Sequence, residues 1–357
     1  MNILIIGTFE NESFASHISE NLNHMGHYVK IFDIMPLRIN NKNKYLYRLN
    51  QLLQKILSIF STISLNNKRG SKISKILNKN KLELIIVTHD FLTPNEVNLI
   101  KNSANVKIVM WFPDHIANFG KAYFMNSNYD FLFFKDPYIV ITLSKILKSK
   151  IYYLPECFNE FNHKNTAFKS QNKYICDITT AGNFHSWRVA FFEHLKDFNI
   201  KFWGSPPPVW MPVKVLNRFY QGRSVFNSEK AEAFLGAKIV LNNLHFAEVL
   251  SLNVRAFEAA GIGAFQLIDW RPEIDHLFID GKEIITYKNI HDLKSKITYW
   301  LLNPDKRHVI ANAGKQRAMK EHTYKHRLNL LIKTVEGIEQ GFKMPDYNNS
   351  TLLNDEN

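Results

Sequence analysis

The sequence predicts an α/β protein made of two Rossmann-like halves, each with its own parallel sheet. Apolar runs of strand length alternate with helical stretches, a pattern typical of parallel sheets. Many of these runs end in glycine, asparagine, histidine or aspartate, and the alternation restarts near residue 161. A chain of 357 residues with 45% hydrophobic residues is long enough and apolar enough to build two cores.

The first half is expected to open with the strand NILIIG, residues 2–7, and a helix over residues 12–25. Its further strands are expected at residues 28–34, 82–90, 106–114, 130–136 and 141–148. Residues 152–163 are expected to form the linker that ends this half.

The second half repeats the alternation with shorter strands. Its strands are expected at residues 173–183, 200–204, 237–244, 263–269 and 283–288. Its helices are expected at residues 187–198, 254–260, 291–302, 304–321 and 324–342. The predicted domains are residues 1–160 and 161–330, with residues 331–357 as the end of the final helix and a frayed tail.

A basic insertion over residues 38–81 interrupts the first half. It holds eleven lysines and arginines and no acidic residue, in a chain of net charge +13. Apolar residues between Tyr45 and Phe60 recur at helical spacing and predict a basic amphipathic helix. Its apolar face either packs into the core or contacts an anionic membrane surface, and a simple solvated surface is the alternative.

Composition and motifs argue against several classes of protein. Cys157 and Cys176 lack metal-ligand spacing, which argues against a zinc site or a disulfide framework and favours a reducing compartment. The amino terminus lacks the features of a signal peptide, and no apolar run approaches the length of a membrane span. No nucleic-acid-binding module is present, so we expect a cytoplasmic protein that binds no nucleic acid.

The helix expected at residue 254 has the features of an anion site. Asn253 can cap it, its first N–H groups and positive dipole end suit a phosphate, and Arg255 adds a forked donor. Glu258 lies on the same face and can accept hydrogen bonds from two neighbouring hydroxyls, as in a ribose. The alternative is a surface helix with an Arg–Glu pair and a glycine stop.

The segment SLNVRAFEAAGIGAFQLID, residues 251–269, resembles the donor-binding segment of the CgeB-like group 1 glycosyltransferases. Other segments resemble the same family in the same order: YLPECFNEFNH, TTAGNFHSWRVAFFEHL, IKFWG, AKIVLNNLH and the closing region over residues 281–328. The resemblance covers residues 150–330 best. It implies a GT-B fold, in which two facing Rossmann-like domains border a cleft and the second domain holds a nucleotide sugar.

The resemblance also implies roles for residues of the second half. Glu258 would hold the ribose, Arg188 and Arg255 would meet the diphosphate, and the remaining donor-binding residues would be Gly182, Asn183, Gly204, Asn243, His245, Ser251 and Asn253. Related retaining enzymes of family 4 carry two glutamates eight positions apart, but Leu250 stands at the first of these positions here. Ser251 or Asn253 is therefore expected to replace the first glutamate, with Glu248 two positions away.

The expected reaction needs neither a metal nor another cofactor. The chain contains no Asp-x-Asp, the motif of many metal-dependent transferases, so cationic side chains and a helix end would stabilise the departing diphosphate. In the first half His89, Asp90, Asp114 and His115 follow strands and are candidates to deprotonate or orient an acceptor hydroxyl. Alternatively, Asp90 caps a helix and His89 is a core residue.

These observations favour a glycosyltransferase that moves a sugar from a nucleotide diphosphate to a saccharide or lipid-linked acceptor. The expected setting is cell-surface polysaccharide or glycoconjugate synthesis. Two alternatives stay open. One is a nucleotide-sugar epimerase of the same fold, and the other is a non-enzymatic basic protein that binds lipid or nucleic acid through residues 38–81.

Overall fold

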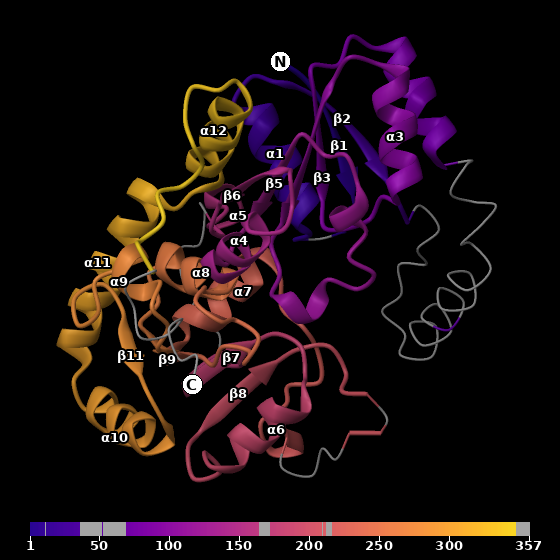
Figure 1. Ribbon diagram of the computed structural model, residues 1–357. Coiled ribbons are helices and arrows are strands. Elements are labelled where there is room, and N and C mark those ends of the chain that lie inside the picture. Colours follow the sequence, from indigo (N-terminus) through magenta and orange to yellow (C-terminus); the bar gives the residue numbers. More distant parts are fainter. Residues whose placement is uncertain are drawn as a thin grey trace, which may run out of the picture. The chain divides into compact units, whose positions relative to one another are not determined.

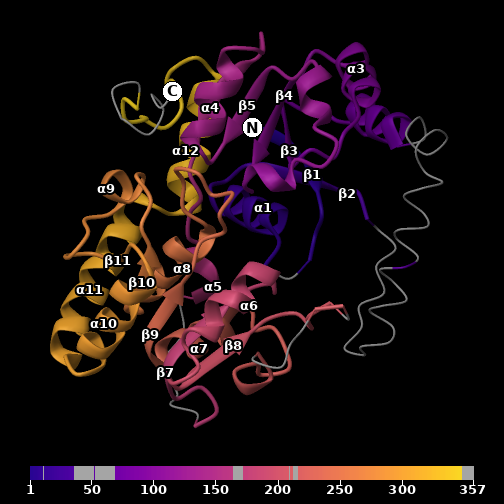
Figure 2. The ribbon, with the colours of Figure 1, turned by 60° about the horizontal axis from the view of Figure 1, so that its bottom comes forward.

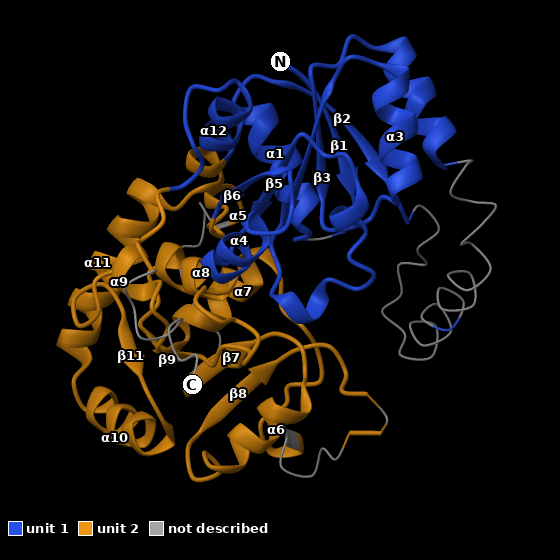
Figure 3. Cartoon of the chain, in the orientation of Figure 1, with its two compact units in different colours: residues 1–154, 328–342 blue, residues 155–327, 343–357 orange. Residues whose placement is uncertain are grey.

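The computed structural model describes residues 1–10, 12–35, 52, 69–163, 172–208, 210–211 and 216–347. Figure 1 gives the element labels, and Figure 3 colours the two compact units into which the chain divides. Unit 1 consists of residues 1–154 and 328–342, and unit 2 of residues 155–327 and 343–357. The predicted amphipathic helix between Tyr45 and Phe60 lies outside the described residues, apart from Leu52.

Unit 1 is built on a six-stranded sheet with the order β2-β1-β3-β4-β5-β6, and all its pairings are parallel. The strands are β1 (Asn2–Gly7), β2 (Tyr28–Asp33), β3 (Leu84–Thr88), β4 (Lys107–Phe112), β5 (Phe131–Phe134) and β6 (Lys150–Tyr153). Strands β3 and β5 are buried along their whole length, as expected for a sheet covered on both faces. The order reverses at β1, so the carboxyl ends of β1 and β3 flank the switch point where such sheets bind ligands.

The helices of unit 1 are α1 (Phe14–His24), α3 (Pro94–Ser103), α4 (Pro137–Ser144) and residues 69–79, with short 3-10 turns at Ile116–Asn118 and Tyr123–Asn126. The strand predicted at residues 141–148 is wrong. Asp136 caps α4 by accepting a hydrogen bond from the Tyr138 N–H at 3.0 Å, and Pro137 starts the helix, so residues 141–144 complete it. The strand follows at β6 instead.

Unit 2 is built on a five-stranded parallel sheet with the order β11-β10-β9-β7-β8. The strands are β7 (Cys176–Ala181), β8 (Ile200–Trp203), β9 (Ala237–Asn242), β10 (Gln266–Asp269) and β11 (Ile285–Tyr287). The chain therefore changes direction across the sheet between β7 and β9. All five strands lie within predicted ones, because each is rich in apolar or β-branched residues that favour strands.

The helices of unit 2 are α5 (Glu160–His163), α6 (Ser186–Glu193), α7 (Asn227–Leu235), α8 (Val254–Ile262), α9 (Ile274–Leu277), α10 (Ile290–Leu301) and α11 (Pro304–Glu321). Side chains of α6, α10 and α11, among them Phe192, Leu293 and Ile310, share one apolar cluster with the strands. Helix α8 packs along α11 and against β9 and β10, and Figure 2 shows α8 between α6 and α11.

The final helix, α12 (Tyr324–Val335), is shorter than the predicted range of residues 324–342. It ends where the Gly337 N–H donates to the Thr334 carbonyl, and the chain then turns so that the Phe342 N–H donates to the Tyr153 carbonyl at 2.9 Å. Most of α12 belongs to unit 1, where it lies beside α1 in both ribbon views (Figures 1 and 2).

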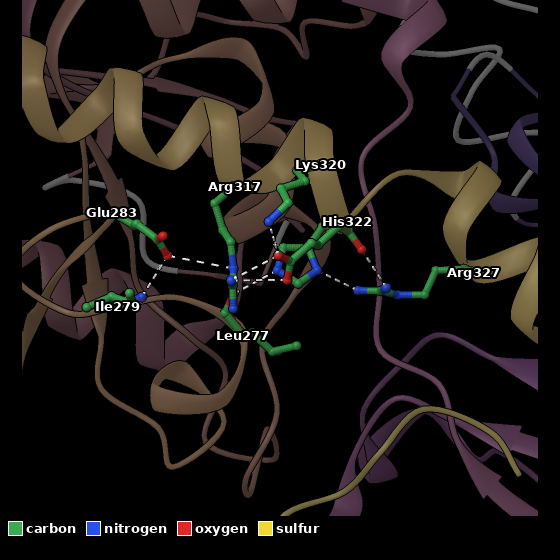
Figure 4. A network of polar contacts seen from close by, with 8 residues as sticks. Leu277, Ile279, Glu283, Arg317, Lys320, His322 and Arg327 are labelled. Atoms are coloured by element: carbon green, nitrogen blue, oxygen red, sulfur yellow. Dashed lines mark hydrogen bonds and ion pairs between the residues drawn. The ribbon is translucent and has the colours of Figure 1, made fainter.

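A buried polar network stabilises the end of α11 in unit 2 (Figure 4). His322 lies 2.7 Å from the Leu277 carbonyl through Nε2 and 2.8 Å from Nη2 of Arg327 through Nδ1. Burial, together with the charge of Arg327, lowers the pKa of His322 to about 2, so the ring is neutral and accepts the arginine N–H. Arg327 also donates to the carbonyls of Pro155 and Glu321 at 3.0 Å. His322 thus has a structural role.

Candidate functional site

The residues predicted to bind a donor gather at the carboxyl ends of β7 and β9, at the switch point of the unit 2 sheet. Gly182 follows β7, Asn243 follows β9, and Gly204 follows β8. The loop of residues 243–253 connects β9 to the amino end of α8 at Val254. Open parallel sheets bind ligands at this position, because the loops diverge there and leave room for one.

The amino end of α8 is held in place by paired amides. Asn253 caps the helix by accepting a hydrogen bond from the Ala256 N–H at 3.3 Å. The Asn253 and Asn242 side chains also exchange two hydrogen bonds of 3.0 Å, which tie the cap to the end of β9. The cap predicted from sequence is confirmed, and the tie to Asn242 fixes the direction in which the first N–H groups of α8 point.

Two buried arginines meet at Gly182. Arg188 of α6 and Arg255 of α8 are 4% and 9% exposed, and a Cβ atom added at Gly182 would lie 2.4 Å from Nη2 of Arg255 and 3.0 Å from Nη1 of Arg188. Arg188 donates to the Asn183 carbonyl at 2.8 Å, and Arg255 donates to Oδ1 of Asn242 at 2.9 Å. In the part of the chain that the structure describes, no ion pair joins either guanidinium to a carboxylate.

The electrostatics of this arginine pair favour an anion. Burial and the neighbouring charge of Arg255 lower the pKa of Arg188 well below its usual range. Burial likewise lowers the pKa of Arg255 to about 10, although Glu258 opposes this shift. Two like charges held out of water repel each other, and a bound anion with several oxygens would relieve that repulsion and accept their hydrogen bonds.

Several buried polar atoms near the arginine pair have no hydrogen-bond partner among the described residues. They are Nε of Arg188, both amide atoms of Asn243, Oγ1 of Thr180 and the hydroxyl of Tyr287. Most buried polar groups in proteins are paired, so a group of unpaired ones at a strand-end site indicates room for a polar ligand. Asn243 is 1% exposed, which makes its two unpaired atoms the most telling of the set.

Glu258 lies one turn along α8 from Arg255. Its Oε1 is 2.8 Å from Nζ of Lys230 on α7, and each of the two side chains is 12% exposed. The carboxylate is therefore on the same helix as Arg255, as the sequence predicts, and its ion-pair partner comes from an element that the sequence analysis did not identify.

The other predicted donor residues surround this centre. Gly204 approaches β7 so closely that a Cβ atom there would lie 2.2 Å from the Gly182 carbonyl oxygen. His245 packs edge-on against the rings of His185 and Trp187, at 5.3 and 5.5 Å between centroids.

Ser251, predicted to replace a missing glutamate, donates a hydrogen bond of 2.9 Å to Oε2 of Glu248. Both residues are buried. Glu248, which lies two positions before the site of the missing glutamate, is thus adjacent to Ser251 in space. The two side chains form one polar group.

The four candidates of unit 1 fall into distinct environments near the switch point of its sheet. Nε2 of His89 lies 3.3 Å from Oδ2 of Asp114. Burial opposes ionisation of Asp114, but the hydrogen bond and charge of His89 outweigh it and hold the pKa of Asp114 at about 2. His89 has a positive φ of 62°, an uncommon conformation for a non-glycine residue that often marks functional sites.

Asp90 has the environment of a structural cap. Its carboxylate accepts hydrogen bonds from the backbone N–H groups of Tyr123 and Phe124 at 2.6 and 2.9 Å. Burial raises the pKa of Asp90 to about 6 against the effect of these two bonds. His115 precedes a 3-10 turn and gives it no side-chain cap.

Two further observations concern metals and membranes. Within the described ranges, no three histidine, cysteine, aspartate or glutamate side chains gather as metal ligands would. Of the helices in those ranges, none combines the length and the apolar character needed to cross a bilayer.

Comparison with known proteins gives a family match and a fold. Residues 187–333 match the family model described as glycosyl transferase-like. This range includes α8, both arginines and Glu258. No protein of curated function matches the chain by sequence. The predicted resemblance to group 1 glycosyltransferases is thereby confirmed over most of unit 2.

Solved structures resemble the chain over nearly its whole length. Sucrose-phosphate synthase from Thermosynechococcus elongatus superposes with a TM-score of 0.62 at 11% identity, covering 95% of this chain and 100% of that one. HepE from Anabaena, solved with UDP-glucose, gives 0.63 at 10% identity, with 94% and 100% covered. A Listeria monocytogenes protein described as a UDP-N-acetylglucosamine 2-epimerase gives 0.54 at 11% identity, with 96% and 100% covered. The predicted α/β class and GT-B fold are confirmed.

Proposed function

We propose that this chain, a glycosyltransferase of GT-B fold, transfers a sugar from a nucleotide diphosphate to a saccharide or lipid-linked acceptor. The observation that carries the proposal is the arginine pair at Gly182, where Arg188 and Arg255 are buried without a carboxylate partner among the described residues. The matching family and the UDP-glucose complex of HepE support the same donor class.

The diphosphate of the donor would lie between the arginine pair and the amino end of α8. The guanidinium groups and the first N–H groups of α8 are held in place before the ligand arrives, so they need little reorganisation as charge develops on the departing phosphate. Preorganised donors of this kind contribute roughly 3–4 kcal/mol each to the barrier reduction. With three such groups, we propose that the leaving group departs without a metal ion or another cofactor.

The ribose of the donor would extend along α8 toward Glu258, which is one turn from Arg255. Its carboxylate can accept hydrogen bonds from the 2′- and 3′-hydroxyls together. Asn243 and His245 would then contact the base or the sugar, with the unpaired amide of Asn243 supplying one donor and one acceptor. By its likeness to family 4 we propose a retaining outcome, with Glu248 and Ser251 near the sugar.

The acceptor would bind unit 1 at the carboxyl ends of β1 and β3. Asp114, whose pKa is held at about 2, is ionised at neutral pH and can accept a hydrogen bond from an acceptor hydroxyl. His89 fixes the direction of that carboxylate. Asp90 and His115 would shape this site rather than exchange protons in it.

The cellular setting is an extension of the same proposal. A cytoplasmic enzyme acting in polysaccharide or glycoconjugate synthesis would meet acceptors at the inner membrane surface. The eleven cations of residues 38–81 would favour an anionic bilayer, at about 1 kcal/mol for each well-placed charge. Sedimentation with vesicles rich in anionic lipid at low and high salt tests this part alone.

The test of the donor assignment is binding followed by turnover. A panel of nucleoside diphosphates and nucleotide sugars should include one that raises the melting temperature of the protein, because a ligand of the native state stabilises it. Glu258→Ala should abolish sugar transfer while the variant still unfolds cooperatively. If no nucleotide in the panel changes the melting temperature, or if Glu258→Ala transfers sugar at the original rate, the assignment is wrong.

The epimerase alternative has one supporting observation, the fold likeness to the Listeria monocytogenes protein. An incubation of the nucleotide sugar without acceptor separates the two: an epimerase converts the donor into its epimer, whereas a transferase leaves it intact or hydrolyses it slowly. Binding of RNA without any affinity for nucleoside diphosphates would instead favour a non-enzymatic basic protein.

A further inference from the structure

Lys230 forms an ion pair with Glu258, the carboxylate that is proposed to bind the donor ribose. Helix α7, which carries it, spans Asn227–Leu235 and packs against α8 within unit 2. Nζ of Lys230 lies 2.8 Å from Oε1 of Glu258, and both side chains are 12% exposed. The pair is therefore largely buried, unlike ordinary surface ion pairs, which are well hydrated and contribute little to stability.

The pair affects the electrostatics of the whole donor site. An unpaired carboxylate at Glu258 would lie one turn from the diphosphate position, where it would repel the phosphates. Paired with Lys230, it adds no net charge to that of Arg188 and Arg255, so the site stays cationic toward a diphosphate. Glu248, the next carboxylate that acts on Arg255, accepts a hydrogen bond from Ser251.

The pair also restricts the Glu258 side chain. A glutamate has several rotamers of similar energy, and fixing one of them on ligand binding costs conformational free energy. A contact that already holds the side chain before the ligand binds reduces this cost. Lys230 contacts one carboxylate oxygen, and a carboxylate has lone pairs for about four hydrogen bonds. The contact with Lys230 therefore uses only part of the acceptor capacity of this carboxylate.

We infer that Lys230 is a positioning residue that orients Glu258 for the ribose diol and so gives the donor site its preference for ribonucleotides over 2′-deoxyribonucleotides. The inference rests on the proposed function and deepens it. Helix α7, which lies outside the α8 segment, thereby contributes to the selection of the ribose in the nucleotide.

The experiment measures dissociation constants by titration calorimetry on the full-length protein. The probes are UDP and 2′-deoxy-UDP, or the corresponding guanosine pair if the wild type prefers it. The variants are Lys230→Met, Lys230→Arg and Glu258→Gln. Lys238→Met is the control for loss of a lysine ion pair away from the donor site, because Lys238 also pairs at 2.8 Å, with Asp177, but is 52% exposed and lies at the amino end of the unit 2 sheet.

Lys230→Met should weaken ribonucleotide binding by about tenfold or more, the effect of truncating one partner of a buried charge pair. It should weaken deoxyribonucleotide binding less, so that the ratio of the two constants falls toward one. Lys230→Arg should restore much of the ratio, and Lys238→Met should leave both constants unchanged. In a Glu258→Gln background, Lys230→Met should have little further effect, because its target is already changed.

The outcomes separate this inference from the proposed function. If the wild type binds no nucleoside diphosphate, the proposed function fails. If it binds ribonucleotides selectively but Lys230→Met keeps the same ratio, only the role of Lys230 is overturned. Equal weakening of both nucleotides by Lys230→Met would indicate a general structural effect and would also overturn it.

Discussion

Gly182→Ala tests whether the two arginines depend on the absence of a side chain at the end of β7. The new Cβ atom would lie 2.4 Å from Nη2 of Arg255, so that guanidinium must move. Its hydrogen bond of 2.9 Å to Asn242 would then break. Gly182 also has a φ of +142°, which an alanine adopts only with strain.

The expected loss of stability combines these two effects. A non-glycine residue at positive φ costs about 1–2 kcal/mol. A lost hydrogen bond to a charged donor adds about 1.5–3 kcal/mol. Gly222→Ala is the matched control, because Gly222 has a φ of +79° but no atom within 4 Å of the added Cβ. We therefore expect Gly182→Ala to lower the free energy of unfolding by roughly 2 kcal/mol more than Gly222→Ala does.

The assay is urea unfolding of both variants, followed by titration with the nucleotide that binds the wild type best. Gly182→Ala should also lose most nucleotide affinity, whereas Gly222→Ala should retain it. Equal destabilisation by the two substitutions, with nucleotide binding intact in both, would refute the close contact between Gly182 and the arginine pair.

Two further predictions concern groups outside the donor site. Arg327→Leu should lower the free energy of unfolding by about 3–5 kcal/mol, because it leaves the Pro155 and Glu321 carbonyls and His322 without their buried donor. The control is Arg317→Leu at a more exposed position, which should lower the free energy of unfolding by about 1 kcal/mol or less in parallel urea titrations. The pKa of Asp114 is lower in the folded chain than in the unfolded chain, so the stability it contributes is present above about pH 4 and is lost as the pH falls toward 2. Asp114→Asn should flatten the stability profile in this window, and an unchanged slope between pH 4 and 2 would contradict the pairing with His89.

Local patterns were sufficient to predict most elements of the fold. Most strands of both sheets contain short apolar runs bounded by polar residues, and α8 lies between the capping residues Asn253 and Gly263, so their signals come from neighbours in the chain. The errors arose where local signals were weak. Helix α7 has no side-chain cap at Phe226 and was not predicted, while the β-branched run from Ile139 to Thr142 belongs to a capped helix.

The candidate site could be predicted only in part, for the same reason. Asn253, Arg255 and Glu258 lie within six residues of one another, and helical spacing alone places them together. Arg188 and Arg255, which meet at Gly182, are 67 positions apart in the chain. Lys230 and Glu258 are 28 positions apart. No periodicity in the chain encodes contacts of this length.

The sequence by itself determined the alternation of strands and helices, the cap and the charge of the α8 segment, and the family to which residues 187–333 are similar. Tertiary structure decided which cations surround that segment and which polar atoms stay unpaired there. The physical reason is that helix and strand signals depend on neighbours within a few residues. The charge environment of a buried group instead depends on every element that packs around it, and β7, β9, α6 and α7 come together only when the sheet of unit 2 has formed.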